Sequence, residues 1–231
     1  QVRGVVRAEL ELWPQAVDDF SKTIEMGDGS CIPRYLRALA NCARGELEAY
    51  RAECWDMLVA YNQLDDANTG NLAAWTCVLA PDAVSDFAPA VSLAERVARL
   101  DVNSPQFAVT LGAVLYRAGR FEEALAQLEA AEQLDFSVDR LASCREYAWL
   151  FLAMTEHRLQ HLDKAREWLD KARAGGDNAL DEHAAAAPLP WNRRQTLALL
   201  QKEAEALLAG SSPARAEVAG GDPNWAASVG K

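Results

Sequence analysis

The sequence predicts an all-α protein, a stack of about five helix pairs followed by a C-terminal capping helix. The first observation behind this is the stretch Leu111–Leu125, which matches a helix, a tight turn at Gly119-Arg120 and the start of a second helix. The second is a position, usually a small residue, that recurs on the second helix of each pair. We place it at Ala16, Tyr50, Ala90, Ala124 and Ala165.

Successive members of this set are 34, 40, 34 and 41 residues apart. A period of 34 residues is that of the tetratricopeptide (TPR) repeat, and the two longer steps imply insertions in loops between units. The chain therefore resembles TPR proteins. The resemblance implies a right-handed α-α superhelix, a TPR solenoid, which binds other proteins and rarely carries chemistry.

The repeat array is expected over residues 1–174, in units at about 1–30, 31–70, 71–104, 105–145 and 146–174. Pro14 suits the first position of a helix, where its missing N–H is not needed. Gly45 makes the turn of the second unit, whereas Gln160 stands at the turn of the fifth at some conformational cost. Tyr50 occupies a position where alanine is usual, so its ring must slide aside or splay the helices.

The individual helices follow from the same register. We expect helices at 4–10, 14–26, 33–43, 46–62, 71–79, 89–100, 146–159 and 162–174, with the fourth pair inside 105–138. The insert 63–69 is polar and predicted to be a loop, and residues 80–86 to form a longer turn.

Beyond the array, Gly175-Gly176 opens a connector predicted over residues 175–190. Residues 191–209 carry leucine and alanine at helical spacing, so we expect an amphipathic helix that covers the apolar face of the last repeat. Residues 210–231 are small and polar and predicted to be a disordered tail. Gln1 falls inside a helical pattern, so we expect the chain to be a piece of a longer protein.

Four strings narrow the resemblance: NLAAWTCVLAPDAV at 71–84, LGAVLYRAGRFEEAL at 111–125, WLFLAMTEHRL at 149–159 and PWNRR at 190–194. They look like the C-terminal TPR regions of large bacterial proteins that also contain a serine/threonine kinase domain, a WD40 propeller or both. The chain itself has no HRD, DFG or glycine-rich loop motif, so the resemblance does not imply kinase activity here.

Composition excludes several partner classes. The formal charge of −11 repels phosphate backbones, and no apolar run reaches the length of a membrane span. We therefore expect neither nucleic acid nor a membrane as partner. The five cysteines are scattered and lack CxxC spacing, which favours reduced thiols in a cytoplasmic protein.

Residues with catalytic or metal-binding chemistry are few. His157 and His161 lie four apart but bracket a predicted turn, and no third ligand is evident, so we expect no metal and no cofactor. Acidic pairs such as Asp18-Asp19 and Glu122-Glu123 point in different directions on a helix and suggest a solvated face. No catalytic motif occurs, so we expect no enzyme activity.

TPR proteins commonly bind peptides or helices in a concave groove lined by the first helix of each pair. The positions expected to face it are Tyr35, Leu39, Trp75, Leu79, Val109, Ala113, Leu150 and Met154. A mixed rim is expected from Tyr116, Arg117, His157 and Arg158. A groove this apolar suits a hydrophobic segment or amphipathic helix, and it should be covered by a partner or by another domain.

The sequence thus favours a non-catalytic scaffold that binds a peptide or helix. The first alternative is an intramolecular regulatory or spacer domain of a larger kinase or WD40 protein. An enzyme built on an α-helical framework is less favoured, as is self-association through the truncated first repeat.

Overall fold

The computed structural model describes residues 1–27, 29–62, 66–136, 142–184 and 189–210, with backbone alone for 142–144 and 176–184. All regular structure in these ranges is helical. The helices are α1 Val2–Glu9, α2 Trp13–Glu25, α3 Ile32–Ala43, α4 Leu47–Tyr61, α5 Ala67–Thr76, α6 Ala88–Leu100, α7 Pro105–Arg117, α8 Phe121–Glu132, α9 Ala142–Arg158, α10 Leu162–Ala184 and α11 Trp191–Ala209. Within this part of the chain, none of the helices has the length and apolar character needed to cross a membrane.

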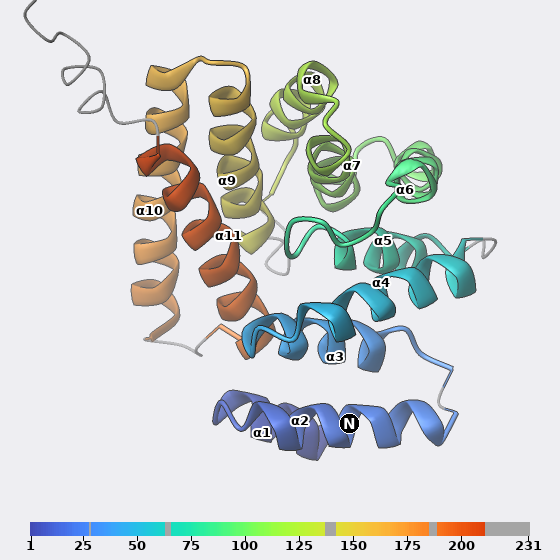
Figure 1. Cartoon of the computed structure of the whole chain (residues 1–231). Helices are drawn as coiled ribbons and strands as arrows, with labels where there is room; N and C mark the ends of the chain where they lie inside the picture. Colours follow the sequence, from blue (N-terminus) through green and yellow to red (C-terminus); the bar gives the residue numbers. More distant parts are fainter. Residues whose placement is uncertain (28, 63–65, 137–141, 185–188, 211–231) are drawn as a thin grey trace, which may run out of the picture.

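The first ten helices form five antiparallel pairs that stack into a right-handed superhelix, as the sequence predicts (Figure 1). Each helix contacts the next one along the chain, and the first helices α3, α5, α7 and α9 also contact one another in succession. We call the surface formed by α1, α3, α5, α7 and α9 the first-helix face. The eleventh helix, α11, runs alongside α9 and reaches α3.

Four of the five pairs turn through a single residue with positive φ. These residues are Glu11 (56°), Gly45 (76°), Gly119 (76°) and Gln160 (66°). The N–H of the following residue donates to a carbonyl at the end of the first helix, namely Leu12 to Arg7, Glu46 to Asn41, Arg120 to Leu115 and His161 to Glu156, at 2.9–3.0 Å. This bonding is the Schellman motif. Because it is the same in all four turns, equal offsets from these residues define equivalent positions.

The recurring positions found in the sequence, at Ala16, Tyr50, Ala90, Ala124 and Ala165, are all fully buried. Tyr50 fits because its hydroxyl points into the third pair, where it donates to the Thr76 carbonyl at 2.9 Å and accepts from the Ala80 N–H at 3.3 Å. Gly112 shows how closely paired helices approach, since a Cβ there would lie 2.5 Å from Cγ of Leu128.

Several predicted helix boundaries are wrong. The first helix of the third pair begins at Ala67 instead of residue 71, because Asp66 caps it by accepting from the Thr69 N–H at 2.9 Å. That helix also ends early, at Thr76, and α9 begins at Ala142, four residues before the predicted start.

The predicted connector is also corrected. The helix α10 continues through Gly175 to Ala184. Gly175 is a packing residue here, because a Cβ would lie 2.5 Å from Cζ3 of Trp149. Residues 185–188 of the connector, 63–65 of the polar insert and 211–231 of the predicted tail lie outside the described residues.

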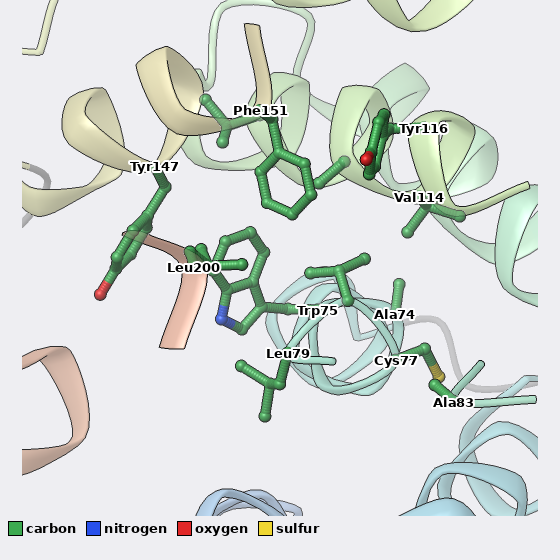
Figure 2. Packing of buried hydrophobic residues seen from close by; sticks show 14 of the residues in the cluster. Ala74, Trp75, Cys77, Leu79, Ala83, Val114, Tyr116, Tyr147, Phe151 and Leu200 are labelled. Carbon is green, nitrogen blue, oxygen red and sulfur yellow. The ribbon is translucent and has the colours of Figure 1, made fainter. Parts of the chain in front are cut away.

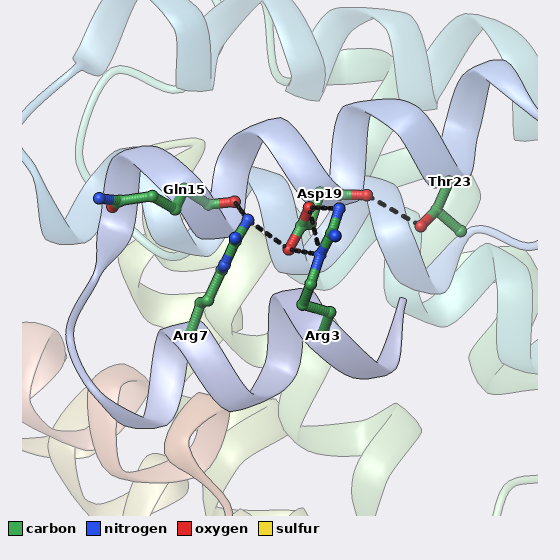
Figure 3. Close-up of polar contacts among 5 residues, drawn as sticks. All are labelled: Arg3, Arg7, Gln15, Asp19 and Thr23. Atoms are coloured by element: carbon green, nitrogen blue, oxygen red, sulfur yellow. Dashed lines mark hydrogen bonds and ion pairs between the residues drawn. The ribbon is translucent and has the colours of Figure 1, made fainter.

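Ion pairs join the two helices in each of the first two units. Asp19 is buried, contrary to the prediction of a solvated face, whereas Asp18 is exposed. The Asp19 carboxylate accepts from Arg3 at 2.6–3.0 Å and from Arg7 at 2.8 Å (Figure 3). The Arg3 guanidinium, more than Arg7, holds the pKa of Asp19 below its usual value.

The second unit repeats this arrangement. Glu53 is buried and accepts from Arg37 Nε at 2.7 Å and from Arg34 Nη1 at 2.9 Å. Arg37 and Glu53 stand eight residues before and after Gly45, as Arg3 and Asp19 do around Glu11. The buried acids of these units therefore have a structural partner built into the repeat.

Candidate binding face

The first-helix face holds most of the residues that the sequence assigns to a groove, but they are not open to solvent. Ten of the twelve are buried: Tyr35, Leu39, Trp75, Leu79, Val109, Ala113, Tyr116, Leu150, Met154 and His157. The Arg117 side chain is 4% exposed, and Arg158 is exposed. Leu79 lies in the loop after α5. An accessible apolar groove is therefore absent at these described positions.

The helix α11 covers this face. It contacts α1, α3, α9 and α10, so it reaches from the first unit to the last (Figure 1). The sequence predicts a helix here that covers only the last repeat, and the structure extends that contact along the face. A capping helix is expected to contact only the repeat that precedes it. In the superhelix, the first and last units lie close enough for α11 to contact both.

The start of α11 is anchored on the first unit by Trp191. This side chain is 2% exposed. Its ring stacks on Phe20 with centroids 6.2 Å apart and lies tilted against Trp13 at 5.8 Å. An aromatic side chain of this size contributes a large apolar area when buried.

Polar contacts hold the same end of α11. The Glu9 carboxylate accepts from the Trp191 N–H at 2.9 Å and pairs with Arg194 Nη2 at 2.7 Å. Burial opposes the charged form of Glu9, but its bonds to Arg194 and to the Trp191 backbone outweigh this and lower its pKa. The first free N–H groups of a helix favour such a negative charge.

The middle of α11 packs on an aromatic cluster. Trp75 lies 5.1 Å from Tyr147 and 6.3 Å from Phe151, centroid to centroid, and Phe151 lies 5.7 Å from Tyr116. Leu200 is fully buried and belongs to the same cluster (Figure 2). The apolar side chains predicted to line an open groove are thus part of the core.

Toward its end, α11 meets Arg117. The guanidinium donates to both carboxylate oxygens of Glu203, with Nη2–Oε2 at 2.6 Å, and to the Val78 carbonyl at 2.8 and 3.2 Å. It also lies 5.5 Å from the ring centroid of Tyr116. Burial disfavours its charge, but the bond to Glu203 outweighs that cost and raises the pKa of Arg117. This predicted rim residue is instead a buried contact to α11.

Sequence reasoning missed three contributors to this contact: Glu9, Trp191 and Glu203. The leucines and alanines of α11 recur at helical spacing, and this pattern predicts an apolar face. Trp191, at the first position of the helix, could have been assigned to that face from the sequence. No local signal pairs Glu203 with Arg117, because the two are 86 residues apart.

The two predicted turn histidines have separate surroundings. His161 Nδ1 lies 2.6 Å from Oε2 of the buried Glu156, and Lys164 lies 3.6 Å from the other oxygen. His157 is buried, and burial, more than Arg158, lowers its pKa. Among the described residues, no three His, Cys, Asp or Glu side chains come together in a way that could hold a metal.

No family model matches the chain, and no curated protein matches its sequence. Solved structures of helical repeat proteins align with it. MamA (AMB-1) is 18% identical with a TM-score of 0.47, covering 77% of this chain and 98% of that one. MamA (MSR-1) is 19% identical with a TM-score of 0.43, covering 74% and 94%. Yeast Tom70 is 18% identical with a TM-score of 0.43, covering 95% and 42%.

Proposed function

We propose that this chain is a non-catalytic protein-interaction scaffold whose first-helix face binds an amphipathic helix. The observation that supports this is α11 itself. This helix contacts α1, α3 and α9 and buries one side, which includes Leu200. Its Trp191 packs on α2, and its Glu203 pairs with Arg117 on α7. The face therefore has the shape and chemistry to hold a helix, which is one of the recurring ways in which proteins recognise peptides.

The buried ionisable groups favour a scaffold over an enzyme. Asp19, Glu53 and Arg117 each have charged partners that neutralise them and join one helix to another. Catalytic groups are usually found in a cleft with unusual pKa values and room for a substrate. These groups instead resemble the structural ion pairs that hold a helical stack together.

The occupied face also favours a second candidate function, an intramolecular spacer or regulatory domain of a larger protein. If α11 never leaves, the face is part of the core and recognises nothing in trans. The two candidates differ in one measurable property, which is whether a helix supplied from outside can take the place of α11.

The test uses the full chain with Leu200→Asp, which places a charge under α11 and weakens its hold. A labelled peptide of residues 189–210 with the natural sequence is added, and binding is followed by fluorescence anisotropy. We expect saturable binding to the variant and none to the unmodified chain, because the attached α11 competes at high effective concentration. A second full-length variant, Trp191→Ala, is tested in the same way, so that the result does not depend on the folding of one variant. We call these two variants the hosts.

The matched control is the same peptide carrying Leu200→Asp, which should not bind either variant. Circular dichroism must show that the hosts keep their helical content. Binding of the natural peptide alone supports the scaffold, whereas folded hosts that bind neither peptide point to the spacer function. Charged substitutions at Trp75 and Leu79 are a poorer test, because they would damage the face that must receive the added peptide, whereas Leu200→Asp changes only the helix to be displaced.

A further inference from the structure

The outer surface of α4 carries an apolar stripe that the repeat architecture does not use. Trp55 is 54% exposed and Val59 is 64% exposed, and Ala52 on the same side is exposed as well. Residues three, four and seven apart lie on one side of a helix, so these three form a continuous strip. Scattered apolar residues on a surface are ordinary, but a half-exposed tryptophan in such a strip points to a contact.

Comparison of the repeats shows that the fold does not need this tryptophan. Trp55 stands ten residues after the turn residue Gly45. The equivalent positions, ten after Glu11, Gly119 and Gln160, are Ser21, Glu129 and Asp170. All three are polar, so a large apolar side chain at this position is peculiar to the second unit.

A hollow of about 670 Å³ lies beside the strip, between α4 and the loop that joins α5 to α6. Its lining residues are Glu48, Arg51, Ala52, Trp55 and Asp82–Ser85. Arg51 fixes the loop against the helix, because Nε donates to the Asp82 carbonyl at 2.9 Å and Nη1 pairs with Glu48 at 2.6 Å. The hollow is thus a formed feature next to an exposed indole.

Acidic side chains near the hollow indicate the charge of the partner that could bind there. Glu48 and Asp82 are exposed acids in the lining of the hollow, and the exposed acids Asp56 on α4 and Asp86 on the loop lie outside that lining. The one cation in the lining, Arg51, is already bonded to Glu48 and to the loop. The whole chain carries −11, so a second copy would meet repulsion here, whereas a basic segment would be attracted.

We propose that the surface around Trp55 binds a basic segment of another protein, with an arginine side chain stacked on the indole. Tryptophan is the best aromatic partner for a cation, and arginine the most frequent cation in such contacts. Apolar neighbours of that arginine would pack on Ala52 and Val59, and further cations would face Glu48 and Asp82. This surface is separate from the first-helix face, so it neither needs α11 to move nor depends on the proposed scaffold function of that face.

The experiment uses the unmodified full chain and a short labelled peptide of arginine and leucine residues separated by glycines. Its counterpart has glutamate in place of arginine. We expect the arginine peptide to bind in a saturable manner, more weakly as salt is raised, and the glutamate peptide not to bind. Trp55→Ser, which installs the residue of the first unit, should weaken binding about tenfold, a change of about 1.4 kcal/mol.

The charge contribution is tested with Glu48→Gln, which should weaken binding about threefold as expected for an exposed charge. Glu129→Gln, at the position on α8 equivalent to Trp55, is the matched control and should leave binding unchanged. The proposal is wrong if the arginine peptide does not bind up to millimolar concentration. It is equally wrong if Trp55→Ser and Glu129→Gln have the same effect, or if the glutamate peptide binds as well.

Discussion

Arg117 on α7 binds both carboxylate oxygens of Glu203 on α11, although the two residues are 86 positions apart in the chain. The guanidinium is almost fully buried, and the carboxylate is partly so. This pair connects the repeat stack to the helix that covers its first-helix face. Its strength therefore bears directly on whether α11 is a fixed element or an exchangeable one.

Replacing Glu203 with alanine leaves the buried Arg117 charge without its carboxylate. Since breaking one side of a buried ion pair is expensive, we expect the free energy of unfolding to fall by roughly 3 kcal/mol. Urea denaturation of the variant and of the natural chain measures this difference in unfolding free energy. Glu205→Ala is the control, because its pair with Arg173 is exposed and should contribute less than about 1 kcal/mol. Equal effects of the two substitutions would contradict a special role for Arg117.

Truncating Trp191 removes the aromatic anchor of α11. We expect Trp191→Ala to destabilise the chain by about 3–5 kcal/mol, because a fully buried aromatic ring is lost and a cavity remains. Trp55→Ala is the same substitution at an exposed site and should change stability by no more than about 0.5 kcal/mol. Thermal or urea unfolding of both variants gives the comparison. Similar losses from both would mean that α11 is not anchored in this way.

The pH dependence of stability should carry the signature of Asp19. Its pKa is lower in the folded chain than in the unfolded one, so its stabilisation is present at neutral pH. It is lost as the pH falls below the unfolded value of about 4 and through the lowered folded value. The difference in unfolding free energy between the natural chain and Asp19→Asn should therefore shrink from pH 7 to pH 3. The exposed neighbour Asp18, changed to asparagine, should give a smaller difference at pH 7.

The turn of the fifth unit should be improved by glycine. Gln160 has φ of 66°, a conformation that costs a residue with a Cβ roughly 1–2 kcal/mol and that glycine adopts freely. We expect Gln160→Gly to raise the unfolding free energy by about 0.5–1 kcal/mol after the greater freedom of glycine in the unfolded chain is counted. Gly119→Gln, the reverse change at the equivalent turn, should lower it by a similar amount. A stabilising Gly119→Gln would refute the equivalence of the two turns.

The sequence predicted the helix pairs well because their determinants are local. A turn such as that at Gly119 and the small residues that recur on the second helices require neighbours only a few tens of residues away. The predicted helix boundaries were less accurate where a residue type that usually marks a loop or a helix end had another role in the structure. Asp66 started a helix inside the expected loop, and Gly175 packed on Trp149 where its type suggested a stop.

The sequence by itself determined the fold class, the pairing of helices and the apolar character of the first-helix face. It did not determine what covers that face. Trp75 and Leu200 are both apolar, and nothing in their local pattern says that they belong to one core. Contacts between the first unit and α11, such as Glu9 with Arg194, form only because the superhelix curves and brings distant units together. Burial of a side chain depends on that curvature, so only the tertiary structure decided which apolar residues were core and which, like Trp55, stayed exposed.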